Sequence, residues 1–373
     1  MNISRSLVAA ASACCLAAAP AFGNAVVRKP VIQVAILLDT SNSMDGLIDQ
    51  ARKQLWRIVN ELATARKDGK APELQVALYE YGNDSLSSES GYIRRVLPLT
   101  TDLDRVSEEL FALKTNGGQE YCGQVIGAAA KGLEWSHSAN DMKLIFIAGN
   151  EPFTQGSVDF HATCRSAVAN GIVVNTIFCG ERQEGINTHW KEGADVADGR
   201  YMAIDQNSRV PEIAAPQDKE IAALGLELNR TYISYGVHGR EGAARQEAQD
   251  ANLAAAPAAN VQRQVAKAAA VYSNTSWDLV DAAKEGVVDL DKVAEKDLPA
   301  EMKKMTPAQR KTYVAENAKK RAEIQAKIKS LDDQRKKYVA QELRKLPSAT
   351  STLDAAVIST VRDLGTKKGY KFP

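Results

Sequence analysis

The chain has 373 residues, enough for two domains, and 45% of them are hydrophobic and 25% charged, as in ordinary soluble proteins. Lysine and arginine together number 47 against 46 aspartates and glutamates, which gives a formal net charge of +1. This balance argues against nucleic acid as the main partner, because phosphate binding usually requires an excess of positive charge.

The N-terminus is predicted to be a secretory signal that covers residues 1–25. Arg5 supplies a small positive charge, an apolar stretch rich in alanine and leucine follows, and small residues then suit cleavage after Gly23 or Ala25. The apolar stretch is too short to span a bilayer, and no later segment is apolar enough. A lipoprotein signal ending at Cys14 is a weaker interpretation. We therefore expect an exported protein, periplasmic or secreted, with no transmembrane segment in the mature chain.

Between residues 30 and 236, apolar runs of strand length alternate with helical patterns. Two of these runs, 31–38 and 172–179, are apolar almost throughout, which is typical of strands buried on both faces. The alternation predicts an α/β fold with a doubly wound, mostly parallel sheet. The other predicted strands are 74–81, 92–97, 143–148 and 200–204. The predicted helices are 47–65, 103–113, 123–135, 161–170 and 213–228.

After residue 236 the strand signals end, and an α-helical C-terminal region, 237–373, is predicted. Helical patterns cover 246–254, 261–271 and 277–284. Thr306, Pro307 and Gln309 form a typical helix start, and the helix that follows is expected to end before Pro347. Its apolar residues recur at three- and four-residue steps. We favour packing of this stripe on helices of the same chain over a coiled-coil partner, because the stripe is short and interrupted by charges.

The most informative stretch is Leu-Leu-Asp-Thr-Ser-Asn-Ser-Met-Asp-Gly, where the first predicted strand ends. Asp39, Ser41 and Ser43 place a carboxylate and two hydroxyls at alternate positions. Parallel sheets bind ligands at the carboxyl ends of their strands, and a hard cation such as Mg²⁺ takes oxygen ligands. One interpretation is therefore a metal site. The other is that a serine caps the next helix while Asp39 forms a turn.

The stretch 31–46 resembles the start of a von Willebrand factor A-type (VWA) domain, with its Asp-x-Ser-x-Ser metal-ion-dependent adhesion site. Residues 115–118 are similar to the family's glycine-rich second loop, 144–152 to its fourth strand and third loop, and 171–180 to its next strand. The resemblance covers roughly residues 30–236. It implies a doubly wound domain that binds Mg²⁺, or else Mn²⁺ or Ca²⁺, through the three oxygen-bearing residues above. It also implies that the ion captures an acidic side chain of a partner protein.

Two positions depart from the family's pattern. Glu120 stands where the second loop of the family presents a threonine, and Ala148-Gly149-Asn150 replaces the Thr-Asp-Gly of the third loop. We hypothesise a rebuilt site in which Glu120 restores the lost carboxylate, because charge and oxygen number are what a hard cation recognises. Asn150 would add an uncharged oxygen, and Glu151 is a reserve carboxylate.

Two other interpretations of Glu120 stay open at this point. A carboxylate in place of the threonine occupies the coordination position that a partner's acid would use, so that a bound ion would be structural. Alternatively, Glu120 is a helix N-terminal residue that the helix dipole favours.

Cys14 and Cys15 fall inside the predicted signal, which leaves Cys122, Cys164 and Cys179. In an oxidising compartment, one disulfide and one free thiol is the simplest expectation. Cys179 ends its strand at the top of the sheet, and Cys164 lies early in the helix that leads into that strand, so we prefer a Cys164–Cys179 bond. Pairing of Cys122 stays open, as does a state with three buried thiols.

The sequence carries no recognisable catalytic pattern. Its four histidines lack metal-ligand spacing, and it has neither a Gly-x-Ser-x-Gly motif nor a phosphate loop. We therefore expect no enzyme, but an adhesion-type module of the cell envelope that binds proteins with the help of a divalent cation. One alternative is a scaffold whose helical tail binds the partner while the metal site is vestigial. A second is a metal-dependent hydrolase with Glu120 or Glu151 as the base.

The C-terminal part carries a resemblance of its own. Residues 226–236 and the run Trp277-Asp278-Leu279-Val280-Asp281 are similar to a junction in exported bacterial proteins that join an A-type domain to a helical tail. This similarity implies an architecture, with the tail's role unassigned. It agrees with a domain boundary near residue 236.

Overall fold

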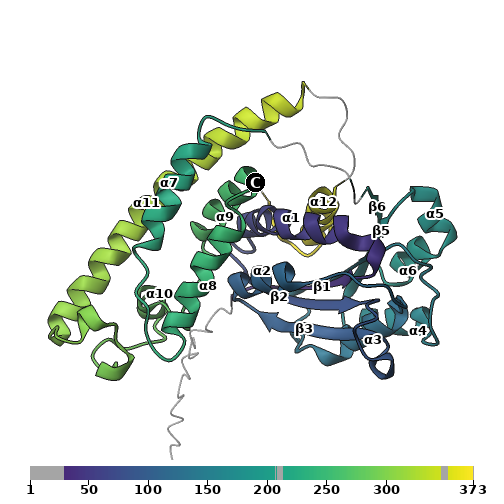
Figure 1. Cartoon of the computed structure of the whole chain (residues 1–373), viewed down its shortest axis with the longest axis horizontal. Coiled ribbons are helices and arrows are strands. Elements are labelled where there is room, and N and C mark those ends of the chain that lie inside the picture. Colours follow the sequence, from purple (N-terminus) through teal and green to yellow (C-terminus); the bar gives the residue numbers. More distant parts are fainter. Residues whose placement is uncertain (1–28, 206, 208–212, 346–351, 373) are drawn as a thin grey trace, which may run out of the picture.

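The structure is a computed structural model that describes residues 29–205, 207, 213–345 and 352–372. The predicted signal lies outside the described residues, as do Pro347 and the residue before it. A six-stranded sheet in the order β3-β2-β1-β4-β5-β6 lies to one side of the molecule, on the right in Figure 1. The strands are β1 (Val31–Asp39), β2 (Glu73–Tyr81), β3 (Ile93–Thr100), β4 (Met142–Gly149), β5 (Val173–Cys179) and β6 (Tyr201–Ile204).

Neighbouring strands run parallel, except that β3 pairs antiparallel with β2. Every residue of β4 and all but one of β1 are buried, because helices cover both faces of the sheet. Alternate side chains therefore enter two separate apolar cores. In β1, Ile32 and Val34 belong to one core, and Ala35 and Leu37 belong to the other. The predicted doubly wound, mostly parallel α/β sheet is confirmed.

The two faces of the sheet carry different helices. One face is covered by α1 (Asp45–Thr64) and α2 (Leu103–Ala112); the other is covered by α3 (Cys122–Gly132), α4 (Phe160–Ala169) and α6 (Trp190–Val196), which follows the short α5 (Arg182–Asn187). The predicted helix 213–228 begins only at Asp218, after Pro216. A residue that precedes proline is disfavoured in the helical conformation, which explains the delay.

The remaining helices are α7 (Asp218–Asn229), α8 (Gly239–Asn252), α9 (Pro257–Lys267), α10 (Leu279–Lys284), α11 (Pro307–Leu343) and α12 (Leu353–Lys367). α9 packs on α1, α8 packs on α2, and α7 packs on both α9 and the long α11 (Figure 1). The predicted capping box opens α11, since the Thr306 hydroxyl accepts a hydrogen bond from the Gln309 amide. None of the helices in the described part of the chain has the length and apolar character that a bilayer crossing requires.

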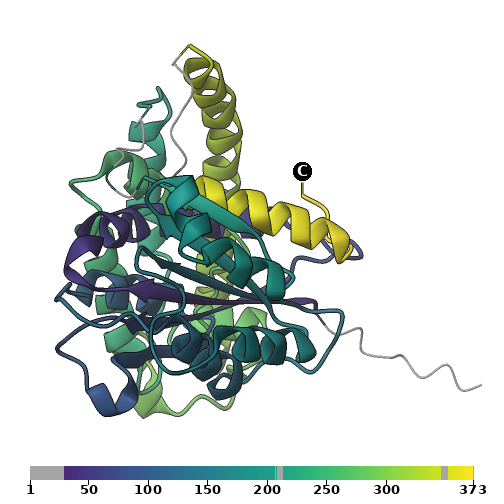
Figure 2. The ribbon, with the colours of Figure 1, turned by 90° about the vertical axis from the view of Figure 1, so that its right-hand side faces the viewer.

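The last helix, α12, returns from the helical region to the sheet. Its buried Val361 belongs to the same apolar core as α1, and the Asp354 amide donates to Gln54 Oε1 of α1 at 2.7 Å. After the helix, the Tyr370 hydroxyl donates to the Val31 carbonyl at the start of β1 at 3.0 Å. Figure 2 shows α12, in yellow, lying against the sheet. The C-terminal segment is thus part of the sheet's packing.

A buried ionic cluster connects the sheet's helices with the helical region. The fully buried Arg263 of α9 pairs with Asp104 of α2 at 2.6 Å and with Asp250 of α8 at 2.5 Å. Its guanidinium also lies 4.6 Å from the ring centroid of Trp56 of α1. Burial alone would raise the pKa of Asp250, but Lys267 and Arg263 lower it to about 2. These charges are paired, which is the condition for keeping them buried.

A second buried arginine fixes α11. Arg321 donates to Asp278 at 2.6 Å and to Asp281 at 2.8 Å. It also donates to the Thr231 carbonyl at 2.7 Å, and its guanidinium lies 4.0 Å from the ring centroid of Tyr232. The Asp278 side chain in turn accepts from the Ile233 amide. This arginine therefore ties the long helix to α10 and to the segment after α7.

We predict that Val361→Asp destabilises the sheet domain by about 3–5 kcal/mol, because it places an unpaired charge in the core under α12. Thermal unfolding followed by circular dichroism measures the effect, with the exposed Lys367→Ala of the same helix as the control. An unchanged melting temperature for Val361→Asp would show that α12 does not stabilise the sheet.

We predict that Arg321→Leu lowers the free energy of unfolding by about 3–5 kcal/mol, because it leaves the buried Asp278 carboxylate without its ion-pair partner. Limited proteolysis measures the result as faster cleavage in the connections around α10 and α11. The neighbouring exposed Lys320→Leu serves as the matched control. Equal cleavage of both variants and the parent would contradict the role given to Arg321.

Candidate functional site

The carboxyl ends of β1, β2 and β4 meet at one edge of the sheet, and backbone hydrogen bonds tie the loops there together. The Thr40 amide donates to the Tyr81 carbonyl at 2.9 Å, and the Asn116 amide donates to the Thr40 carbonyl at 3.0 Å. The buried Asn83 side chain donates to the Lys114 carbonyl at 2.9 Å. Three loops are thus held around the end of β1.

Asp39, the last residue of β1, is completely buried at the centre of these loops. Its Oδ1 atom accepts a hydrogen bond from the Ser41 amide at 2.8 Å, whereas its Oδ2 atom is buried without a partner. Gly82 and Gly149 flank the carboxylate so closely that a Cβ atom on either would lie 2.9–3.0 Å from its oxygens. A buried acceptor that lacks a donor costs free energy, so this position favours a cationic ligand.

The two serines lie beside Asp39 and do not cap a helix. Ser41 Oγ and Ser43 Oγ are 3.3 Å apart, and Ser43 Oγ accepts from the Asn150 side-chain amide at 3.2 Å. Ser41 precedes the short 3₁₀ turn 42–44 without a side-chain capping bond, and Met44 precedes α1, also without one. Neither serine therefore caps α1, whereas the turn at Asp39 that the same interpretation predicted is present, since Asp39 Oδ1 accepts from the Ser41 amide. The hydroxyl oxygens of both serines instead lie with Asn150 at the end of β1.

Glu120 reaches the same centre from the second loop. Its side chain is only 5% exposed, and a Cβ atom on Gly82 would meet both Glu120 Cγ, at 2.7 Å, and Asp39 Oδ1, at 2.9 Å. The Glu120 amide donates to Gln155 Oε1 of the third loop at 2.6 Å. Since α3 begins only at Cys122 and its first turn contains no acidic residue, Glu120 is not a helix N-terminal residue.

Burial and mutual repulsion dominate the electrostatics of the two carboxyl groups. Burial raises the pKa of Asp39 to about 7, against the opposing hydrogen bonds from Ser41 and with a further contribution from Glu151. Burial, followed by the charges of Asp39 and Glu151, raises the pKa of Glu120 to about 7. The folded protein therefore resists ionisation of this pair unless a positive charge is brought to it.

Asn150 and Glu151 come from the third loop, directly after β4. Asn150 contacts Ser43, as described above, and Glu151 is half-buried, with its carbonyl accepting from Trp190 Nε1 at 2.7 Å. Because Trp190 is fully buried, this bond anchors the loop to the core beneath it. The structure thus brings all six residues predicted from the sequence to one edge of the sheet.

The donor set suits a hard cation. It consists of carboxylate, hydroxyl and amide oxygens, which Mg²⁺, Mn²⁺ and Ca²⁺ prefer, and contains no imidazole or thiolate. In the part of the chain that the structure describes, no three His, Cys, Asp or Glu side chains are grouped so as to hold a metal by themselves. A cation here would therefore depend on Ser41, Ser43 or Asn150 in addition to Asp39 and Glu120.

Two residues of the site were missed by the sequence analysis. Gln155 Oε1 accepts a hydrogen bond from the Glu120 amide. The buried Tyr81 hydroxyl, next to Asp39, donates a hydrogen bond to the Ala148 carbonyl at 3.0 Å. A Cβ atom on Gly149 would lie 2.5 Å from that hydroxyl. Both contacts join residues from different loops or strands, so no local spacing in the sequence signals them.

The predicted Cys164–Cys179 disulfide is not formed. Cys122, Cys164 and Cys179 are all free and buried. The thiol of Cys164 belongs to the core under α3 and α4, whereas Cys179 belongs to the core under α1. Because side chains alternate along β5, it is Phe178, and not Cys179, that enters the core containing Cys164.

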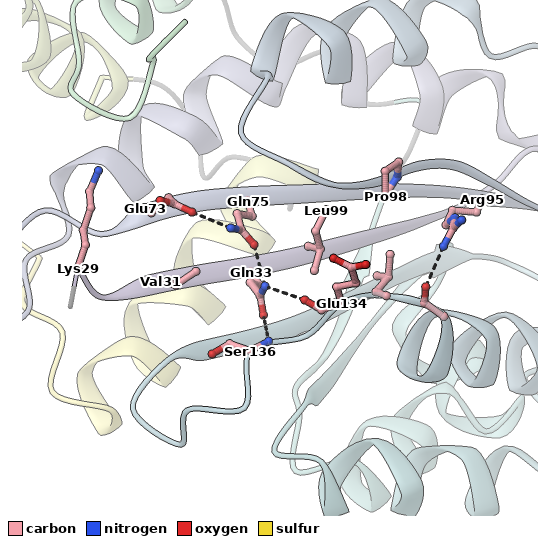
Figure 3. Close-up of a pocket in the computed structure, with 12 residues that line it drawn as sticks. Lys29, Val31, Gln33, Glu73, Gln75, Arg95, Pro98, Leu99, Glu134 and Ser136 are labelled. Atoms are coloured by element: carbon pink, nitrogen blue, oxygen red, sulfur yellow. Dashed lines mark hydrogen bonds between the residues drawn. The ribbon is translucent and has the colours of Figure 1, made fainter. Parts of the chain in front are cut away.

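The opposite end of the sheet carries a separate polar pocket of about 540 Å³ (Figure 3). Its floor is formed by the first residues of β1 and β2, where Gln33 Nε2 donates to Gln75 Oε1 at 2.7 Å and Gln75 Nε2 donates to Glu73 Oε1 at 2.6 Å. Gln33 Oε1 accepts from the Ser136 amide. The pocket does not include Asp39 and is not part of the site described above.

Comparison with protein-family models and with curated proteins gave no significant match. Among solved structures, the chain is similar to the conserved hypothetical protein BatB from Bacteroides thetaiotaomicron, at 18% identity and a TM-score of 0.36, over 48% of this chain and 91% of that one. It is similar to the SpRpn10 VWA domain at 16% identity and a TM-score of 0.36, over 50% of this chain and 100% of that one.

A third similar structure is the pilus adhesin SpaC from Lactobacillus rhamnosus GG in its open conformation, at 13% identity and a TM-score of 0.35, over 48% of this chain and 28% of that one. Identities this low, with TM-scores below 0.5, carry no argument about function. The strand order and the loop at the end of β1 describe the fold independently of these likenesses.

We predict that Glu120→Gln raises the melting temperature of the metal-free protein at pH 8 and has little effect at pH 4.5. The ordinary pKa is 3.8 for the carboxyl group of Asp39 and 4.5 for that of Glu120. In the folded protein burial raises both pKa values to about 7. The stability that these two groups contribute is therefore present below pH about 4 and is lost as the pH rises towards 7. Removing one of the two acids relieves that loss.

Thermal melts in EDTA at the two pH values measure this effect, and each 1 kcal/mol of relieved repulsion corresponds to about 2–4 °C for a domain of about 200 residues. The exposed Glu323→Gln on α11 serves as the control. A lower melting temperature of Glu120→Gln at pH 8 would mean that the ionised Glu120 stabilises the metal-free fold.

Proposed function

We propose that the sheet domain, which has a von Willebrand factor A-type fold, is a non-enzymatic protein-binding module that holds a divalent cation at the loops around Asp39. The ion is Mg²⁺, or the similar Mn²⁺ or Ca²⁺. The observation that carries the proposal is the buried Oδ2 atom of Asp39, which has no hydrogen-bond partner and lies beside a second buried carboxylate, Glu120. A divalent cation would supply the charge that this pair lacks.

The proposal includes the rebuilt ligand set. The third loop offers Asn150 where the resemblance implies an aspartate, and Glu120 enters from the second loop instead. Both residues lie around Asp39 and the two serines, which supports replacement of one carboxylate by the other. Asp39, Ser41 and Glu120 would be inner ligands because they are buried, while Ser43 and Asn150 would complete the outer side.

The face that carries the cation is also the face proposed to meet the partner. Capture of a partner's acidic side chain, which the resemblance implies, needs a coordination position that Glu120 leaves open. A cation fully enclosed by the chain would instead be structural and would shape the loops for binding. Partner binding that depends on Mg²⁺ favours either of these modes over a scaffold that binds through its helical tail alone.

The site of action proposed for this module is the cell envelope or the exterior. Support for export comes from the predicted N-terminal signal and from the similarity of the 226–236 junction to exported proteins. The hydrolase alternative keeps Glu120 or Glu151 as a base, and turnover of a generic ester or peptide would favour it.

We predict that calorimetric titration of Mg²⁺ or Mn²⁺ into the mature chain shows one binding site. Asp39→Ala should abolish binding and Glu120→Gln should weaken it at least about tenfold, equivalent to about 1.4 kcal/mol, because each removes a carboxylate that faces the ion. Glu73→Gln, in the pocket at the other end of the sheet, is the matched control and should bind like the parent.

Absence of heat in the parent, together with no cation-induced rise in melting temperature, would contradict cation binding. Binding by the parent that Glu120→Gln leaves unchanged would keep the cation but reject the rebuilt ligand set.

A further inference from the structure

The polar pocket at the start of β1 and β2 lies apart from the proposed cation site, at the opposite end of the strands (Figure 3). Gly132, the last residue of α3, lines this pocket, so the pocket begins where that helix stops covering the sheet. Its volume of about 540 Å³ falls within the range of about 300–1,000 Å³ that is typical of small-molecule sites. The pocket is therefore large enough for a ligand of several linked groups.

The floor of the pocket contains a buried glutamine within an otherwise apolar run. Gln33 is 3% exposed, and all the other residues of 31–38 are apolar. Its Nε2 atom donates to Gln75 Oε1 at 2.7 Å and to the Glu134 carbonyl at 3.3 Å, and its Oε1 atom accepts from the Ser136 amide at 2.7 Å. An apolar residue would avoid the desolvation cost of burying an amide here. These bonds hold the amides of Gln33 and Gln75 in place on the floor, and such preorganisation favours ligand binding.

The loop that forms one wall of the pocket is also fixed, by a buried lysine. Lys143 of β4 is 6% exposed, and its ammonium group donates to the Ser136 carbonyl at 3.0 Å and to the Asn170 carbonyl at 2.5 Å. The Ser136 hydroxyl donates to the buried Asp141 carboxylate at 2.5 Å. The wall therefore rests on residues outside the pocket, which is how a rigid binding site is supported.

Charged side chains of both signs line the pocket. Lys29 and Arg95 are exposed bases, Glu134 is an exposed acid and Glu73 is a half-buried acid. Figure 3 shows Lys29 and Glu73 towards one end and Arg95 towards the other, with Gln33 and Glu134 between them. A ligand that contacts all of these groups carries a positive and a negative charge, with hydrogen-bonding groups between the two.

We propose that this pocket binds a short peptide with free termini. The amides of the floor each present N–H donors and a C=O acceptor, which pair with the peptide groups of such a ligand. Glu73 and Glu134 would bind its terminal ammonium group, and Arg95 and Lys29 its terminal carboxylate, through charge-assisted hydrogen bonds. Arg95 Nη1 already donates to the Gly132 carbonyl at 2.8 Å, which holds the guanidinium at the pocket. An uncharged sugar would not use the charges of these acids and bases.

The test is calorimetric titration of trialanine into the mature full-length chain, beside N-acetyltrialanine, which lacks the terminal ammonium group, and maltotriose, an uncharged sugar. We expect trialanine to bind and N-acetyltrialanine to bind at least about tenfold more weakly. The double variant E73Q/E134Q should bind trialanine about tenfold more weakly than the parent and leave the affinity for N-acetyltrialanine unchanged. The variant R95Q should weaken the binding of both peptides.

The matched control is E323Q/D333N, which removes two exposed acids of α11 and should bind trialanine like the parent. Mg²⁺ binding by E73Q/E134Q should equal that of the parent, which shows that the variant is folded and that the two sites are separate. Absence of heat from trialanine, equal affinity for the two peptides in the parent, or tighter binding of maltotriose than of trialanine would each overturn the proposal.

Discussion

The buried carboxylate of Asp39 is the constraint around which this edge of the sheet is built. Asp39 ends the central strand β1, and one of its carboxylate oxygens lacks a hydrogen-bond partner. A second carboxylate, Glu120, lies with Asp39 next to Gly82. Two buried acids cost stability unless a positive charge joins them. The missing side chains of Gly82 and Gly149 let the carboxylates approach the loop backbone closely, and backbone bonds among the loops keep the acids in place. Cation binding at this site explains why the fold keeps two buried acids that lower its stability.

The helical region is connected to the sheet domain through buried charge as well as apolar packing. Arg263 joins helices on both sides of the boundary predicted near residue 236, and α12 places the end of the chain on the first strand. The loop of Asp39 follows β1, and the loop of Glu120 follows α2. The helical region contacts both of these elements, so segments distant in the sequence support the site. Removal of the helical region would therefore leave α1 and α2 without part of their cover.

Local patterns predicted the fold well, since strand length, helical period and the capping box at Thr306 are properties of neighbouring residues. The spacing of Asp39, Ser41 and Ser43 marked the first loop of the site for the same reason, whereas the resemblance to the A-type family indicated Glu120, Asn150 and Glu151. Gln155, Tyr81 and the return of α12 were not predictable, because each contact joins segments far apart in the chain. The predicted Cys164–Cys179 disulfide was wrong because the side chain of Cys179 lies on the opposite face of the sheet from Cys164.

The most direct test of the central claim is anomalous diffraction from crystals of the mature protein grown with Mn²⁺. We expect one peak at coordination distance from both Asp39 and Glu120, with Ser41 or Ser43 among the nearest oxygens. A peak that contacts Asp39 while Glu120 turns away would contradict the rebuilt ligand set. No peak at saturating Mn²⁺ would mean that Asp39 is buried for a reason other than cation binding.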